Sequence, residues 1–316
     1  GRRNKPFSTS ASVRRSIHFG RTNGYARGMA SSFLVFLSLL LAVPGLSAVA
    51  DDRPSTIEDF MEIDAPIRVI AHRGFSGRAP ENTLVAIRRA IETGADMVEI
   101  DVTMTADGHV ILLHDETLDR TTDGLGVPTE MTLDEIQRLD AGSWFSPEFA
   151  GERIPTLTKA LEMVKDRILI NVEIKSEAVV HGVVPQVAAL INEHGMIDQV
   201  VVSSFSPEAL RLMKVTDPAV VTASLFNKEL HAGRDPLEIL QEVGARGYNI
   251  SAKRVTEAVI ERCHRHDIPV SVYTVNEPEE MRRLMEMGVD AVFTDSPDLM
   301  LLVREEAAAG AAANAD

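Results

Sequence analysis

The sequence predicts an α/β protein, a (β/α)8 TIM barrel with a β-hairpin extension after strand 2 and an inserted segment at residues 117–154. Short apolar strands alternate with amphipathic helices over about 250 residues, the usual length of eight βα units. Nine apolar strands can be counted, but only Asp107-Gly108 separate the third from the second, and a parallel crossover needs about a dozen residues. The third strand is therefore a hairpin return, and eight barrel strands remain. A doubly wound open sheet is the alternative, but no G-x-G-x-x-G motif follows the first strand.

Residues 1–50 have the order of a basic leader followed by a secretory signal peptide. Residues 1–28 contain seven Lys or Arg and no Asp or Glu; the apolar run 33–43 and the small residues 48–50 follow. Because Pro44 stops the run well short of the roughly 17 to 25 residues of a spanning helix, we expect cleavage after Ala50 and no stable membrane span afterwards. The protein is then exported, to the periplasm or the medium. An uncleaved anchor is the alternative.

The charge balance excludes some partners. Loss of residues 1–50 would remove seven basic residues and change the formal net charge from −15 to about −22. Such a surface repels phosphate backbones, so we expect no nucleic-acid partner, and a small phosphorylated substrate would need cations placed locally. The single cysteine, Cys263, cannot form an internal disulfide.

The remaining elements follow in order. Residues 51–65 are predicted to be a solvated lead-in, 66–303 the barrel domain and 304–316 an Ala-rich tail. Predicted barrel strands are 67–71, the first hairpin strand from residue 97, 168–174, 199–205, 220–226, 247–250, 269–275 and 291–295. Predicted helices are the segment between Thr83 and Gly94, then 157–164, 180–193, 207–214, 236–243, 256–266 and 279–287. The inserted segment is rich in glycine and turn residues, contains a helix at 133–139 and holds the only tryptophan.

The hairpin predicts a cluster of chemically active side chains. If Asp107-Gly108 form a two-residue turn, paired positions sum to 215, so that Asp101 lies opposite His114. Glu99 lies two residues from Asp101 and shares its face, because strand side chains alternate. Two acids and an imidazole are thus predicted on one patch, although a hairpin with an ordinary polar face is the simpler alternative.

Other polar residues end the predicted strands, where TIM barrels carry their catalytic groups. The strand-end residues are His72, Arg73, Glu99, Asp101, Glu173, Lys175, Ser203, Phe205, Tyr273, Asn276 and Asp295. Their shared position at one rim favours a site over isolated packing roles.

Glu99, Asp101 and Glu173 predict a metal site. Each like-charged pair at a few ångströms costs roughly 3 to 4 kcal/mol at an effective dielectric of 20, and a divalent cation removes that cost. All-oxygen ligands favour one Ca²⁺ or Mg²⁺ over Zn²⁺. The alternative is neutralisation by Arg73 and Lys175 without a metal.

His72 and His114 suit acid–base chemistry beside such a cation. An imidazole has a pKa near 6.5, so two of them can supply the base and the acid that displacement at a phosphodiester needs. Arg73 and Lys175 can hold phosphate oxygens, the former as a fork and the latter as a point charge.

The ordered motifs together resemble the glycerophosphodiester phosphodiesterase family. They are H-R-G (72–74), P-E-N-T (80–83), E-I-D-V-T-x-T-x-D-G (99–108), H-D-x-T-L-D-R-T-T (114–122), R-I-P-T-L (153–157), E-I-K (173–175), S-S-F (203–205) and Y-T-V-N (273–276). The resemblance runs from about residue 69 to 297. It implies that His72 and His114 are catalytic, that Glu99, Asp101 and Glu173 bind Ca²⁺ or Mg²⁺, and that Arg73, Lys175, Phe205 and Tyr273 bind substrate. Members of the family often have tryptophan before T-V-N, where this sequence has Tyr273. The difference concerns the preference for the alcohol portion of the substrate.

The reaction implied is metal-dependent hydrolysis of a small glycerophosphodiester, such as glycerophosphocholine or glycerophosphoethanolamine, to glycerol 3-phosphate and an alcohol. Attack by the glycerol 2-hydroxyl through a cyclic phosphate and direct attack by water are both open. Alternatives are phospholipase D-like cleavage of lysophospholipid or sphingomyelin, for which the inserted segment would need room for an acyl chain, and a non-catalytic binding protein on the same barrel.

Overall fold

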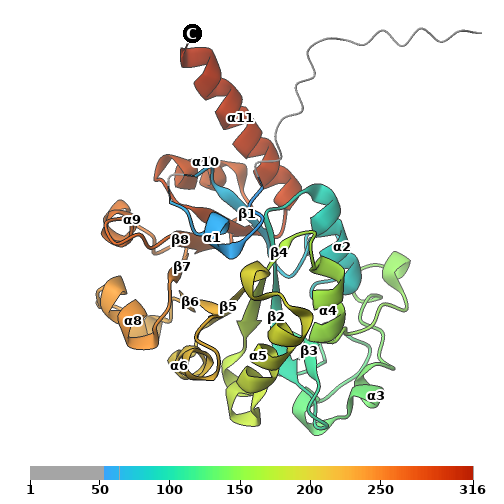
Figure 1. Ribbon diagram of the computed structural model, residues 1–316. Coiled ribbons are helices and arrows are strands. Elements are labelled where there is room, and N and C mark those ends of the chain that lie inside the picture. Colours follow the sequence, from blue (N-terminus) through green and yellow to red (C-terminus); the bar gives the residue numbers. More distant parts are fainter. Residues whose placement is uncertain (1–52, 64, 316) are drawn as a thin grey trace, which may run out of the picture. The chain divides into compact units, whose positions relative to one another are not determined.

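Eight parallel strands close into a barrel in the computed structural model, which describes residues 53–63 and 65–315 (Figure 1). The strands are β1 Arg68–Ala71, β2 Met97–Met104, β4 Leu169–Ile174, β5 Val200–Ser204, β6 Val221–Leu225, β7 Gly247–Ser251, β8 Val270–Tyr273 and β9 Ala291–Thr294. They pair in sequence order, and β1 pairs with both β2 and β9 to complete the circle. The predicted fold class is confirmed. The predicted signal peptide, residues 1–50, lies outside the described ranges.

Helices follow the strands and cover the barrel. They are α2 Leu84–Thr93, α4 Leu157–Val164, α5 Val183–His194, α6 Pro207–Thr216, α7 Lys228–His231, α8 Pro236–Val243, α9 Glu257–His264, α10 Pro278–Glu286 and α11 Pro297–Ala315. The Thr83 hydroxyl accepts a hydrogen bond from the Ala86 N–H and Gly94 ends α2 in the left-handed conformation, as the sequence predicts. The helix predicted from residue 180 begins at Val183, because a 3₁₀ segment, Ser176–His181, precedes it.

The hairpin forms, but its predicted register is wrong by one residue. Strand β3, Val110–Leu112, pairs antiparallel with β2, and Val102 lies opposite Leu112. The Thr105 N–H donates to the His109 carbonyl, so the loop has three residues and ends at Gly108, whose φ is +82°. Asp101 therefore faces Leu113, whose N–H donates to its carbonyl, and His114 lies beyond the end of the strand.

The inserted segment packs on the outside of β3. It contains the short helix α3, Leu133–Ile136, which ends earlier than the predicted 133–139. Its apolar side chains form a closed cluster with the outer face of the hairpin; the buried members are Ile111, Leu113, Leu118, Ile136, Ala141 and Ile154. Trp144 contacts Phe145 edge to face.

The lead-in is not solvated throughout, contrary to expectation. Residues Ile57–Phe60 form helix α1, and Ile57 and Phe60 are buried. Both belong to a cluster with the inward-facing residues at the amino ends of the strands, among them Ile70, Met97 and Phe293. Helix α1 therefore closes the amino end of the barrel, where side chains contribute to stability rather than to chemistry.

The carboxyl-terminal segment is helical to residue 315. Helix α11 begins at Pro297 and includes most of the Ala-rich tail, and its later turns extend away from the barrel (Figure 1). Alanine has the highest helix propensity, which explains a helix that few contacts support. In the described part of the chain, no helix combines the length and apolarity needed to cross a bilayer.

Candidate active site

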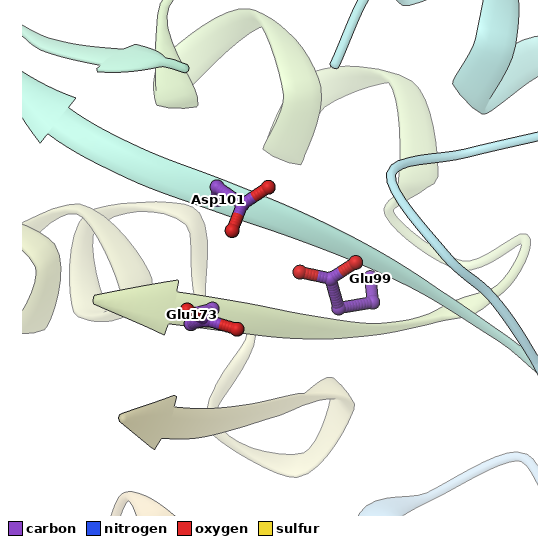
Figure 2. Close-up of side chains that lie close together, drawn as sticks. All are labelled: Glu99, Asp101 and Glu173. Carbon is purple, nitrogen blue, oxygen red and sulfur yellow. The ribbon is translucent and has the colours of Figure 1, made fainter. Parts of the chain in front are cut away.

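The three predicted acidic ligands come together at the barrel mouth. Glu99 and Asp101 stand on β2, and Glu173 is the register partner of Asp101 on β4. One carboxylate oxygen from each lies within 4.8 Å of the others, and the side chains converge between the two strands (Figure 2). Glu99 and Asp101 are almost fully buried, while 13% of the Glu173 side chain is exposed. Such a cluster could hold a metal ion.

The backbone around β1 builds one wall of this cluster. Arg73 has a φ of +54°, a conformation that is uncommon for residues other than glycine. In this conformation its N–H donates to Glu99 Oε2 at 2.8 Å. Asn82, with a φ of +56°, donates from Nδ2 to Asp101 Oδ2 at 2.9 Å and accepts from the Asp101 N–H. The acids are thus fixed by loops that precede α2.

Arg73 and Lys175 lie against the acids. Lys175 Nζ is 3.0 Å from Glu173 Oε1 and 3.5 Å from Asp101 Oδ1, and Arg73 Nε is 3.4 Å from Asp101 Oδ2. Glu99 Oε1 is buried and has no hydrogen-bond partner within the described chain. The two cations therefore balance part of the acidic charge and leave one buried carboxylate oxygen unsatisfied.

The pKa values of the three acids reflect this excess of negative charge. Burial raises the pKa of Glu99 well above its ordinary value, and the charges of Asp101 and Glu173 add to the rise. Burial together with Asp101 raises the pKa of Glu173 to about 7, although Lys175 opposes the shift. Burial would also raise the pKa of Asp101, but Lys175 and Arg73 bring it below its ordinary value. Ionising all three acids at once is costly without a further positive charge.

Each predicted catalytic histidine is held by a carboxylate. His72 Nδ1 lies 2.7 Å from Asp295 Oδ1, and His114 Nδ1 lies 2.7 Å from Asp115 Oδ1. A carboxylate at Nδ1 keeps the proton on that nitrogen and leaves Nε2 available for proton transfer. Burial lowers the pKa of His114, although Asp101 counteracts the effect.

The carboxylate beside His72 is itself fixed. Asp295 follows β9 and accepts hydrogen bonds from Ser76 Oγ at 2.9 Å and Asn276 Nδ2 at 2.6 Å. Burial raises the pKa of Asp295, but the hydrogen bonds from His72, Asn276 and Ser76, together with the charge of His72, bring the value down to about 2. Asp295 and Asn276 stood among the strand-end residues in the sequence, but the contact of Asp295 with His72 depends on the pairing of β1 with β9.

The predicted aromatic residues contact each other. The rings of Phe205 and Tyr273 meet edge to face with centroids 5.9 Å apart, and Tyr273 donates from its hydroxyl to the Phe226 carbonyl. They follow β5 and end β8, the strands on either side of the pair β6 and β7. Substrate binding by Phe205 and Tyr273, and by Arg73 and Lys175, stays a prediction.

Sequence reasoning missed the residues that support the site from loops. Asp115, Glu81 and Arg120 form hydrogen-bonded ion pairs beside His114 and Arg73. Glu81 and Asn82 stood in the P-E-N-T motif and Arg120 in the H-D-x-T-L-D-R-T-T motif, each without an assigned role in the site. Nothing in the sequence indicated that these residues lie beside the histidine or the acids.

Known proteins are similar to this chain in sequence and in fold. The model of the glycerophosphoryl diester phosphodiesterase family matches residues 72–299. A glycerophosphodiester phosphodiesterase of Caldanaerobacter subterraneus is 39% identical over 240 residues, covering 75% of this chain and 98% of that protein. One from Bacillus altitudinis is 36% identical over 244 residues, covering 76% and 98%. The structure of an Oleispira antarctica phosphodiesterase in complex with the product sn-glycerol-3-phosphate superposes with a TM-score of 0.71 at 32% identity, covering 75% of this chain and 96% of that one. The chain is therefore an enzyme of the glycerophosphoryl diester phosphodiesterase family.

Proposed function

We propose that this enzyme hydrolyses small glycerophosphodiesters, such as glycerophosphocholine or glycerophosphoethanolamine, to glycerol 3-phosphate and an alcohol. The observation that carries the proposal is the convergence, at one barrel mouth, of three acids and two carboxylate-held imidazoles. The names of the relatives and the product complex of the Oleispira protein support the substrate class.

The proposal includes one divalent cation held by Glu99, Asp101 and Glu173. The donor set is all oxygen, which Ca²⁺ and Mg²⁺ prefer, and the buried Glu99 Oε1 lacks a partner within the described chain. A bound cation would polarise a phosphoryl oxygen and balance the charge that develops there. Complete removal of metal with EDTA should abolish activity, and restored activity with Ca²⁺ or Mg²⁺ would identify the ion; unchanged activity would exclude the metal.

The side chains divide the remaining work. One histidine removes the proton of the attacking hydroxyl and the other protonates the leaving alcohol, each through Nε2. Arg73 and Lys175 bind phosphate oxygens, and both lie within reach of the acid cluster. Phe205 and Tyr273 offer an apolar wall to the carbon skeleton of the substrate.

A substrate analogue can show which group is the nucleophile. The glycerol 2-hydroxyl can attack phosphorus and give a cyclic phosphate that water then opens, or water can attack directly. A panel of glycerophosphodiesters assayed with each cation tests the activity, and the 2-deoxy analogue separates the routes. Cleavage of that analogue at the full rate would exclude the cyclic route.

Phospholipase D-like cleavage is less well supported. An acyl chain would need space near the inserted segment, yet the cavity bounded by Glu81, His114 and Ile154 has only about 10 Å³. The apolar residues of the insertion fill their own cluster. A non-catalytic binding protein would not need both histidine–carboxylate pairs.

We also propose that residues 1–50 direct export to the periplasm or the medium, on the basis of the basic, apolar and small-residue order of that segment. Fractionation of cells expressing the full chain, with amino-terminal sequencing of the product, tests this. Retention of the uncleaved chain in the cytoplasm would contradict it.

A further inference from the structure

Arg120 is engaged along two edges of its guanidinium. On one edge, Nε lies 2.6 Å from Asp115 Oδ2 and Nη2 lies 3.0 Å from Asp115 Oδ1. On the other, Nη1 lies 2.7 Å from Glu81 Oε2 and Nη2 lies 2.8 Å from Glu81 Oε1. Two forked contacts of this kind need the planar guanidinium, because a lysine ammonium is a single point charge.

Both carboxylates also contact residues of the proposed site. Asp115 Oδ1 is hydrogen-bonded to His114 Nδ1 at 2.7 Å, and Glu81 Oε1 accepts a hydrogen bond from Arg73 Nη1 at 2.7 Å. Arg120 thus connects the segment after β3 to the loop before α2. The four side chains alternate in charge in the order Asp115, Arg120, Glu81 and Arg73. About 44% of the Arg120 side chain is exposed, so its contribution is geometric more than a matter of burial.

His114 needs such support more than His72 does. His72 follows β1 directly, and its carboxylate partner is fixed by Ser76 and Asn276, which are neutral. His114 lies two residues past the end of β3, outside the ladder that fixes the strand. The carboxylate that orients it is held on both oxygens by Arg120.

We propose that Arg120 is a positioning residue for catalysis, which fixes Asp115 and thereby orients the His114 imidazole with its proton on Nδ1. The inference rests on the proposed function, since it assigns a partner to one of the two proposed catalytic histidines. It predicts that an exposed arginine in the inserted segment, which is not a member of the acid cluster, controls turnover through His114.

The first measurement compares Arg120→Gln and Arg120→Lys with the wild-type enzyme on glycerophosphocholine. We expect kcat to fall about 10- to 100-fold in both, as for other residues that orient a reacting group, with little change in KM. Arg138→Gln is the matched control, because Arg138 lies in the same insertion and pairs with Asp134 on the surface. Its kcat should equal that of the wild type, and the melting temperatures report folding.

A double-mutant cycle separates positioning from a general structural effect. In a His114→Ala background, Arg120→Gln should cause almost no further loss of kcat, whereas in a His72→Ala background it should cause its full loss. Equal fold losses in the two backgrounds, or an unchanged kcat for Arg120→Gln alone, would overturn the proposal.

A spectroscopic measurement makes the inference independent of activity. In ¹⁵N spectra of the folded protein near pH 8, His114 should carry its proton on Nδ1, and Arg120→Gln should mix the two tautomers. An unchanged His114 tautomer would contradict the positioning role. If the wild-type protein cleaves no glycerophosphodiester, the proposed function fails, while this spectrum still tests Arg120. If Arg120→Gln does not fold, Arg120→Lys provides the same comparison.

Discussion

His72 and His114 are prepared for proton transfer in the same way, with different supports. In both, Nδ1 contacts a carboxylate, and no hydrogen bond to either Nε2 comes from residues 53–63 or 65–315. Asp295 is fixed by neutral donors, whereas Asp115 shares its charge with Arg120. Because the carboxylate fixes the ring tautomer, each ring can present one nitrogen to substrate without reorganisation.

Replacing either histidine tests this arrangement at the scale of single residues. His72→Ala and His114→Ala should each lower kcat by about 10²- to 10⁴-fold, the usual contribution of a general acid or base, with melting temperatures near that of the wild type. His109→Ala is the control, since His109 pairs with Asp107 at the exposed end of the hairpin. Full activity in His72→Ala or His114→Ala would rule out the two-histidine mechanism.

The acid cluster makes cation binding depend on pH. The pKa of Glu173 in the folded protein is raised to about 7. Folding therefore favours protonated Glu173, and the free energy of unfolding falls as pH rises from 4.5 through 7, by roughly 3 kcal/mol once Glu173 is ionised. The pKa of Glu99 is raised in the same direction. A cation must displace these protons and then removes the repulsion, so binding strengthens as pH rises.

We therefore expect Ca²⁺ or Mg²⁺ to raise the melting temperature more at pH 8 than at pH 5. Scanning calorimetry of EDTA-treated protein with and without cation measures the increments. Glu99→Gln should reduce the increment at pH 8, because it removes one charged ligand. Equal increments at the two pH values would argue against cation binding at these acids.

At the scale of elements, the hairpin shows what local sequence can and cannot predict. Its existence followed from alternation around Asp107-Gly108, but its register did not. Asp107 accepts hydrogen bonds from the Thr105 hydroxyl and from the Leu133 N–H, which lies 26 residues away in the insertion. That distant contact accompanies a three-residue loop in place of the two-residue turn, and no local pattern encodes it.

The candidate site was predictable to the extent that strand ends define it. His72, Glu99, Asp101 and Glu173 follow from the rule that barrel chemistry gathers at the carboxyl ends of strands. Asp115, Glu81 and Arg120 lie in connecting segments, whose paths depend on tertiary contacts. The pairing of His72 with Asp295 joins the first and last strands, and only closure of the barrel brings them together.

The loop after β1 offers a test at this scale. The Gly77 N–H donates to the Asp295 carbonyl at 2.8 Å, and a Cβ at Gly77 would lie 2.5 Å from that oxygen. Gly77→Ala must therefore displace the loop that carries Ser76, and we expect kcat to fall by up to about 100-fold.

Gly310→Ala is the control for that substitution. Gly310 lies in α11 with open space around its Cβ position, so alanine should leave kcat unchanged and strengthen the helix. Wild-type kcat for Gly77→Ala would mean that this loop does not position Asp295.

At the scale of the whole molecule, the barrel separates stability from chemistry. Glu99, Asp101 and His72 lie toward the carboxyl ends of the strands, while Ile57 and Phe60 of α1 pack against the amino ends. The lead-in was expected to be solvated, but Ile57 and Phe60 are buried. A barrel with an open amino end needs apolar side chains from elsewhere to fill it, and this need is visible only in three dimensions.

Removing one of the apolar side chains of α1 should lower the stability of the protein without changing its catalytic rate. Phe60 is 5% exposed and contacts the inner layer that includes Phe293, so Phe60→Ala should cost about 3 to 5 kcal/mol of unfolding free energy. Because the substitution leaves the barrel mouth untouched, kcat of the folded variant should equal that of the wild type. Urea unfolding and steady-state kinetics measure the two quantities, with Val215→Ala, at an exposed position, as the control that changes neither. A large loss of kcat at full folding would mean that the amino end of the barrel transmits its packing to the active site, and the separation of the two ends would be wrong.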